Sequence, residues 1–383
     1  MAYSAIMRER ELLDTIAKMA AGVSARFPSV LVGPGDDCAV LDTQSRDGRA
    51  LLVTTDHVVE GVHVQWAAPK YERGALDLMA RKAIARSVSD IAAMGGEPLA
   101  CVATACVDRA MPQDALEYLS EAFQRFGIKL NCPVVGGDIA GFSRRVNEGG
   151  GGKGGGVASG SSGSGEAQAM PIVLTVTAVG RAHEQVGPVL RSGCKVGDAV
   201  YVTGGLGGSL ASGRHATFVP RVEEARWLCD AAAKQAGKMN NGESLSDMRR
   251  QAMPLHAMMD LSDGLGIDAD RLAQASAGEV ALRRDEGVAI VLESTWLPMH
   301  DGVASWREAI SDGEDYELVF VADAGWALDG AIEVLDAQGV KRTTKITRVG
   351  MVVLRESVPS QCCVRTPEGK MIDASQSGYR HEE

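Results

Sequence analysis

Apolar residues recur at two different spacings along this chain, and together these spacings predict a mixture of strands and helices. Apolar, β-rich runs at 49–56, 99–107, 132–138 and 171–182 predict strands, whereas helical spacing at 76–96 and 114–127 predicts two helices. Both helical runs end at glycine, which is typical of a helix C-terminus. The second half continues the mixture, with a strand expected near 196–204, a helix within 260–276, and a turn entering a strand at 310–320.

One segment breaks this pattern. Residues 147–169 are nearly all Gly, Ser and Ala, so they lack the apolar side chains that a packed core needs and are predicted to form a flexible insertion. A phosphate-binding glycine loop is the less favoured alternative, because such loops are short and fixed between a strand and a helix. The strand pattern resumes at 171–182, so we expect the insertion to join antiparallel neighbouring strands of one domain, where loop length costs little.

The length of 383 residues indicates two domains, which we place at 1–182 and 183–383. Because helices and strands are mixed in both halves, the expected class is α+β, with mixed or antiparallel sheets flanked by helices. The chain has no apolar run near the roughly 18 residues of a membrane span, and its first 20 residues lack the apolar block of a signal peptide. We therefore expect a cytoplasmic location without membrane association.

Charge and cysteine content narrow the functional classes further. The formal net charge of −11 argues against nucleic-acid binding, which needs a basic surface. The eight cysteines are scattered, without a C-x-x-C pair or nearby histidines at zinc-ligand spacing, so they are expected to be reduced structural thiols. A chain this acidic suits a protein whose carboxylates bind cations.

Acidic residues recur in one setting, beside Gly, Ser or Thr at the edges of apolar elements. They are Asp36 and Asp37 after a turn, Thr54, Thr55 and Asp56 at a strand end, Ser89 and Asp90 in a helical run, Gly136, Gly137 and Asp138 at a strand end, and Asp260, Ser262 and Asp263 before a helix. Magnesium prefers oxygen ligands from a few carboxylates, waters and phosphates. The whole set therefore predicts a magnesium site.

Each cluster taken singly also has a structural interpretation. Asp36 and Asp37 could be turn residues, with no basic residue within 33–40 to pair with them, and Asp263 could cap a helix. Asp90 is different, because a carboxylate inside an apolar helix is costly without a partner. The glycine-rich segment 204–213 matches no complete phosphate-binding motif, so a tight structural turn is favoured there.

Seven motifs, in chain order, resemble the successive signatures of the thiamine-monophosphate kinase family. They are GPGDDCAVL, TTDHVVEGVHV, RKAIARSVSDIAAMGGEP, VVGGDIAG, RSGCKVGDAVYVTGGLGGSLA, MDLSDGLGIDADRLAQAS and SDGEDYEL. This family belongs to the superfamily of aminoimidazole ribonucleotide synthetase, selenophosphate synthetase and a hydrogenase maturation factor. The resemblance runs from about residue 33 to about residue 320 and implies the two-domain fold of that superfamily.

The resemblance implies ATP-dependent phosphorylation of thiamine monophosphate to thiamine diphosphate, with several magnesium ions. By matching position, the implied metal ligands are Asp36, Thr54, Thr55, Asp56, Asp90, Asp138, Asp260 and Asp263, with Asp37 a weaker candidate. The implied ATP contacts are Gly137, Asp138, Arg191 and Ser262, and the implied substrate contacts are His63 and Glu314. It also implies a homodimer through the N-terminal domains, with the C-terminal domain closing the active site.

Without the resemblance, His63 could equally be a packed histidine with no role in binding, and Glu314 could be a carboxylate in a turn. The chain also departs from the family pattern where Asp312 precedes Gly313, and where Gln376 stands at the place of an aromatic residue. Whether Gln376 or Tyr379 replaces that substrate-stacking aromatic stays open. No general base is identified, and direct in-line transfer is expected. The alternatives are another ATP-using superfamily member, of the purine-synthesis or selenophosphate type, and a non-catalytic nucleotide- or metal-binding homologue.

Overall fold

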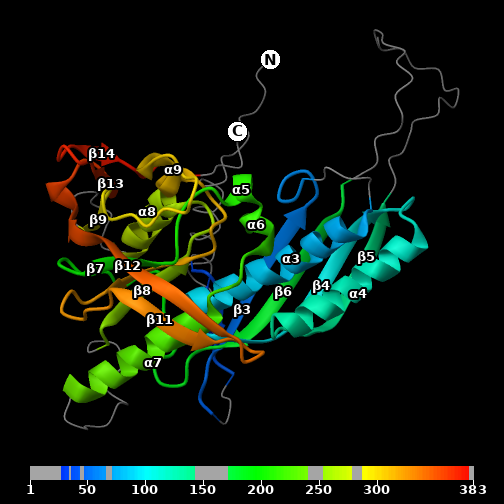
Figure 1. Cartoon of the computed structure of the whole chain (residues 1–383). Coiled ribbons are helices and arrows are strands. Elements are labelled where there is room, and N and C mark those ends of the chain that lie inside the picture. Colours follow the sequence, from blue (N-terminus) through cyan, green and yellow to red (C-terminus); the bar gives the residue numbers. More distant parts are fainter. Residues whose placement is uncertain are drawn as a thin grey trace, which may run out of the picture.

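The computed structural model describes residues 27–33, 36–43, 47–65, 71–142, 171–239, 253–277 and 287–378. Within them the chain forms two β-sheets with helices packed against both (Figure 1). The first sheet uses strands from the first half of the chain, and the second uses strands from the second half. The predicted α+β class with mixed sheets is therefore confirmed.

The first sheet has the order β1-β2-β3-β6-β4-β5 in the described residues. Its strands are β1 Val30–Val32, β2 Ala39–Leu41, β3 Leu51–Val59, β4 Glu97–Asp108, β5 Val134–Phe142 and β6 Val173–Arg181. All neighbours are antiparallel except β4 and β5, which are parallel. The expectation that 147–169 joins neighbouring strands is wrong, because β4 lies between β5 and β6 and pairs with both.

Helices α3 (Arg73–Ala93) and α4 (Gln113–Lys129) lie side by side on one face of this sheet (Figure 1). The side chain of Glu72 accepts a hydrogen bond from the amide of Ala75 and caps α3, while Gly95, at φ +69°, turns the chain away just beyond its end. Buried residues occur on every side of α3, because the helix also contacts α7, α6 and β8. It therefore connects the two halves of the fold.

The second sheet has the order β14-β13-β9-β12-β7-β10-β8 in the described residues, with β11 paired to β12. Its strands are β7 Ala199–Thr203, β8 Leu255–Asp260, β9 Val288–Glu293, β10 Leu318–Ala322, β11 Gly330–Leu335, β12 Lys341–Leu354, β13 Cys362–Arg365 and β14 Met371–Asp373. β7, β9 and β10 are buried at every position, so they form the centre of a covered sheet rather than a surface layer.

The helices of the second half are α5 Ser209–Ser212, α6 Arg214–Thr217, α7 Val222–Met239, α8 Leu265–Ser276, α9 Trp306–Ser311 and the short 3₁₀ helix η1 Arg355–Ser357. One apolar core joins α8 to this sheet, and another joins α7 to its other side and to the end of α3. The second sheet is thus packed on both faces.

The strands of the first sheet end at Arg181 and those of the second begin at Ala199, while the exact boundary at 182/183 stays a prediction. The predicted insertion 147–169 and Tyr379 lie outside the described residues. Among described residues, no helix combines the length and the apolar character needed to cross a membrane. All eight cysteines are free, as predicted.

Candidate active site

Three carboxylates from different parts of the chain meet beside α3. Asp37 follows the turn before β2, Asp90 belongs to the last turns of α3, and Asp260 ends β8. Their carboxylate oxygens lie within 4.8 Å of one another. The sequence predicted Asp90 and Asp260 as ligands and gave Asp37 less weight than Asp36, whereas the structure brings Asp37 into this group and leaves Asp36 outside it.

Hydroxyl groups hold two of these carboxylates in place. Thr54 Oγ1 donates to Asp90 Oδ2 at 2.5 Å, and Ser89 Oγ donates to Asp260 Oδ2 at 2.6 Å. Burial, reinforced by neighbouring carboxylates, raises the pKa of Asp90 well above its ordinary value and raises the pKa of Asp260 to about 8. Such a buried group of oxygen ligands fits a divalent cation, which would neutralise the charge that burial disfavours.

Asp36 and Asp37 have a basic partner, Arg191, that comes from a distant part of the sequence. Arg191 donates from Nε to Asp37 Oδ2 at 3.1 Å and from Nη2 to Asp37 Oδ1 at 2.7 Å. The backbone amide of Arg191 donates to both oxygens of Asp36, at 3.3 and 3.1 Å. Arg191, predicted to contact ATP, thus binds the acidic turn with both its backbone and its side chain.

Thr55 and Asp138 lie away from the cluster of Asp37, Asp90 and Asp260. Side chains alternate along β3, so Thr54 is buried towards α3 while Thr55 is exposed on the opposite face, in contact with Thr177. Asp138 is paired with Thr104 on β4 and is exposed on the edge strand β5. Its strand lies three strand spacings from β3, or roughly 14 Å.

The strand-end positions expected for two motifs are wrong. β3 continues three residues beyond Asp56, to Val59, and β5 continues beyond Asp138 to Phe142, because both strands pair along their full length. Gly137 has a packing reason, since a Cβ there would lie 1.8 Å from the backbone oxygen of Ala103. Gly137 therefore marks a close contact between β5 and β4.

Asp263 belongs to a separate ion-pair group at the start of α8. Its carboxylate pairs with Arg271, which also contacts Asp268 Oδ1 at 2.9 Å. Asp268 in turn accepts the amides of Asp263 and Gly264. The N-cap of α8 is Gly264, so the structural alternative that Asp263 caps this helix is wrong.

Asp56 lies on the same face of β3 as Thr54 and meets a cation from α3. Arg86 Nη2 is 3.3 Å from Asp56 Oδ1, and Arg86 Nη1 donates to the backbone oxygen of His57 at 3.1 Å. This places Asp56 one helical turn of α3 away from the level of Asp90. Arg86 was not among the predicted site residues.

The two predicted substrate residues meet at a buried lysine. Lys82 is fully buried in α3, donates from Nζ to the backbone oxygen of His63 at 2.8 Å, and forms an ion pair with Glu314. His63 is itself buried, and its Nδ1 accepts the amide of Val59 at 3.1 Å. Burial lowers the pKa of Lys82, while Glu314 opposes that shift. His63 and Glu314, 251 positions apart in the sequence, are therefore held around one ammonium group.

The glycine-rich segment 204–213 contains two tight-turn glycines whose amides donate to carboxylates. Gly207 donates to Asp315 Oδ2 at 2.8 Å and Gly208 donates to Asp312 Oδ2 at 2.7 Å, both with positive φ. Ser209 Oγ also donates to Asp315, at 2.7 Å. These amides bind carboxylates of the 312–316 loop, so the extra aspartate at 312 fastens that loop to the turn.

The C-terminal residues pack beside the start of α8. The amide of Ile267 donates to the backbone oxygen of Ser377 at 3.1 Å, and a Cβ on Gly378 would lie 2.5 Å from the backbone oxygen of Asp263. Gln376, at the place of the family's aromatic residue, is exposed there. Ser262 is nearby along the chain, and its backbone oxygen accepts the amide of Glu314 at 2.7 Å.

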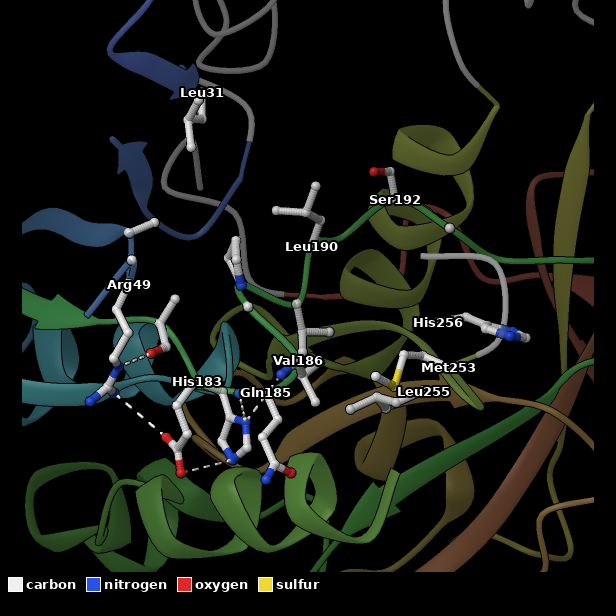
Figure 2. Close-up of a pocket in the computed structure, with 18 of the residues that line it drawn as sticks. Leu31, Arg49, His183, Gln185, Val186, Leu190, Ser192, Met253, Leu255 and His256 are labelled. Atoms are coloured by element: carbon white, nitrogen blue, oxygen red, sulfur yellow. Dashed lines mark hydrogen bonds and ion pairs between the residues drawn. The ribbon is translucent and has the colours of Figure 1, made fainter. Parts of the chain in front are cut away.

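A separate cavity of about 510 Å³ lies along the connection between the two sheets (Figure 2). Arg49, His183, Val186, Leu190 and His256 are among its lining residues, and none of the predicted site residues is. His183 Nδ1 faces the amides of Gln185 and Val186 at 3.3 Å, so its proton belongs on Nε2, 3.3 Å from Asp230. That tautomer opposes metal binding by His183, although Glu184 and Asp230 are close.

Comparisons with known proteins agree with the resemblance. The family described as "AIR synthase related protein, N-terminal domain" matches residues 35–182. The thiamine-monophosphate kinase of Rhodopirellula baltica is 32% identical over 346 residues, covering 87% of each chain, and that of Mycobacterium tuberculosis is 30% identical over 325 residues, covering 80% of this chain and 82% of its own.

A solved structure described as "AaThiL complexed with AMPPCP and TMP" has a TM-score of 0.62 and 23% identity, and the match covers 100% of this chain and 99% of that one. This likeness confirms the predicted aminoimidazole ribonucleotide synthetase-like fold. The identity to curated relatives, sustained over most of both chains, adds the family to the fold. This chain belongs to the thiamine-monophosphate kinase family.

Proposed function

We propose that this chain is an enzyme that transfers the γ-phosphoryl group of ATP to thiamine monophosphate, giving thiamine diphosphate and ADP. The relatives named above carry that activity in their names, and the solved structure with the same fold is described with an ATP analogue and TMP. As a biosynthetic kinase that uses ATP, it is proposed to work in the cytoplasm.

One geometric observation carries this proposal. A single helix, α3, contributes Asp90 to the carboxylate group and Lys82 to the contact between His63 and Glu314. The two residues are eight positions apart, which corresponds to about 12 Å along a helix. Two phosphorylated substrates, one bound at each end, would bring their phosphates together alongside this helix.

The chemistry needs charge neutralisation and alignment more than proton transfer. The second pKa of a phosphomonoester is about 6, so the attacking phosphate oxygen is already largely deprotonated near neutral pH. No general base is needed, and none is assigned. The protein's own contribution is to hold the acceptor oxygen in line with the γ-phosphorus and to exclude water.

We propose magnesium at the cluster of Asp37, Asp90 and Asp260, with Asp56, one helical turn of α3 away, as a further ligand when ATP is bound. When bound, magnesium would supply positive charge that offsets the negative charge of the phosphates. Arg191 holds Asp36 and Asp37 in position for this role, and Thr54 and Ser89 orient Asp90 and Asp260.

A homodimer through the first sheet is also proposed, as the family resemblance implies. The face of this sheet opposite α3 and α4, which we term the open face, exposes Thr55, Val102, Cys106 and Asp138 and is covered by no helix in the described residues. A second copy on the open face would bury these exposed side chains. Sedimentation should show a dimer, and Val102→Asp should dissociate it.

The direct test is incubation of the purified chain with ATP, magnesium and thiamine monophosphate, followed by chromatography of the thiamine products. Thiamine diphosphate should appear in proportion to ADP, and chelation of magnesium should stop it. Absence of thiamine diphosphate at saturating substrates would refute the proposed function. Phosphorylated protein trapped during turnover would contradict direct transfer.

A further inference from the structure

Arg86 lies midway between the two ends of the proposed site. It is four residues after Lys82 and four residues before Asp90, so all three side chains follow one side of α3 at intervals of about 6 Å. Lys82 marks the end where His63 and Glu314 meet, and Asp90 marks the carboxylate group. Arg86 therefore lies where phosphates arriving from the two ends would meet.

The guanidinium of Arg86 keeps unused hydrogen-bond donors in this position. Of its five N–H groups, the structure assigns a hydrogen bond only to Nη1, which donates to the backbone oxygen of His57 within the described residues. Nη2 makes a charge contact with Asp56 at 3.3 Å, and the buried Nε has no hydrogen-bond partner among the described residues. A buried donor without a partner is costly, so a ligand that accepts from it gains affinity.

The surroundings keep this guanidinium charged. Burial opposes the charge, but Tyr316, Asp56, Glu314 and Asp90 outweigh burial and raise the pKa of Arg86 above its ordinary value. The Arg86 side chain is 16% exposed, and its Nε lies below that exposed part. A permanently charged, planar donor is suited to a phosphate group.

The neighbouring cationic side chains already have partners within the protein. Lys82 is fully buried and binds Glu314 and the backbone of His63. Arg81 donates to the backbone oxygens of Ala216 and Phe218, and Arg191 forms a two-bond pair with Asp37. Among these four cations of the described site, Arg86 alone retains a buried N–H group without a partner.

We propose that Arg86 is a catalytic residue that binds the phosphate of thiamine monophosphate through Nε and a neighbouring N–H group, holding the acceptor oxygen for attack. This proposal rests on the proposed function. The positive charge would offset repulsion between the acceptor phosphate and ATP, and the hydrogen bonds would fix the direction of the attacking oxygen. Arg86 would bind non-reacting phosphate oxygens, so no proton is transferred to or from it.

The test compares two ligands that differ by one phosphate. Binding of thiamine monophosphate and of thiamine to the full chain is measured by calorimetry, without ATP, for wild type, Arg86→Gln and Arg86→Lys. Losing charge-assisted hydrogen bonds to a buried group should weaken thiamine monophosphate binding roughly tenfold to hundredfold in Arg86→Gln, while thiamine binding changes less than about twofold. Arg86→Lys should recover part of the lost affinity, since lysine keeps the positive charge but lacks the planar set of guanidinium donors.

Controls separate this outcome from misfolding and from failure of the proposed function. Arg125→Gln removes an arginine that is 46% exposed on α4 and should bind both ligands as wild type does. An unchanged preference for the phosphorylated ligand in Arg86→Gln and Arg86→Lys would overturn the role of Arg86. Wild type that neither binds nor phosphorylates thiamine monophosphate would instead overturn the proposed function itself.

Discussion

Replacing Asp260 by asparagine should change how the stability of the metal-free protein depends on pH. Burial is the largest cause that raises the pKa of Asp260 to about 8, and Asp37 and Asp268 add to it, while Ser89 and Arg191 oppose it. The unfolded chain releases this proton near pH 4. Between about pH 4 and pH 8 the folded state therefore holds a proton that the unfolded state has lost, so stability falls as pH rises.

The magnitude follows from the same two values. Each pKa unit corresponds to about 1.4 kcal/mol, so titration of Asp260 should lower the free energy of unfolding by about 4 kcal/mol between pH 5 and pH 8. The asparagine side chain cannot ionise, so Asp260→Asn should lose about 4 kcal/mol less than wild type over this range. Its amide also weakens the contact with Ser89, which costs about 1 kcal/mol at all pH values.

Urea unfolding in the presence of a chelator, at pH 5 and at pH 8, measures this difference. Adding millimolar magnesium at pH 8 should stabilise wild type, because the cation replaces the proton, and should stabilise Asp260→Asn much less. Parallel loss of stability in the two proteins between pH 5 and pH 8 would refute a protonated Asp260 in the metal-free fold. Equal stabilisation by magnesium would remove Asp260 from the proposed metal site.

Three further substitutions test other contacts. Asp56→Asn should reduce turnover at least roughly hundredfold with only a small fall in melting temperature from the weakened contact with Arg86, and retained turnover would leave Asp56 a structural role. Lys82→Met should lower the unfolding free energy by roughly 3–5 kcal/mol in urea titrations, because it leaves the Glu314 carboxylate without its ion-pair partner. Adding Glu314→Gln should restore part of that free energy, whereas no recovery would argue against the pair. Gly193 has a φ of +131°, and a Cβ there would lie 2.3 Å from the backbone oxygen of His256. Gly193→Ala should therefore lower the unfolding free energy by about 1–3 kcal/mol in the same urea titration, and an unchanged urea midpoint would contradict this close approach.

Much of the fold could be predicted because local signals agree with the final packing. The helix expected at 76–96 is observed as Arg73–Ala93, and the strand expected at 171–182 is observed as Val173–Arg181. Strand order could not be predicted, since pairing depends on long-range contacts that periodicity does not encode. The position of β4 between β5 and β6 is such a contact, and it explains the wrong expectation about the insertion.

The aspartates at 36 and 37 show where sequence reasoning about the site stopped. Their segment has no basic residue, so they appeared unpaired, yet Arg191 binds both of them from 155 and 154 positions away. Asp36 accepts backbone amides and Asp37 reaches the carboxylate group, the reverse of the preference the sequence supported. Two adjacent carboxylates point in different directions, and only the packed backbone decides which one faces the site.

A polar residue inside an apolar helix was the strongest signal of the site, and α3 shows both its value and its limit. Asp90 was identified because a buried carboxylate needs a partner, and the same reasoning applies to Lys82, Arg86 and Ser89 on the same helix. Their partners lie far along the chain, with sequence separations of 36 for Thr54 and Asp90, 171 for Ser89 and Asp260, and 232 for Lys82 and Glu314. A helix pattern identifies which side chains must be satisfied, but the groups that satisfy them come from other elements. Arg86 Nε has no hydrogen-bond partner among the described residues, and we propose a ligand phosphate as its partner.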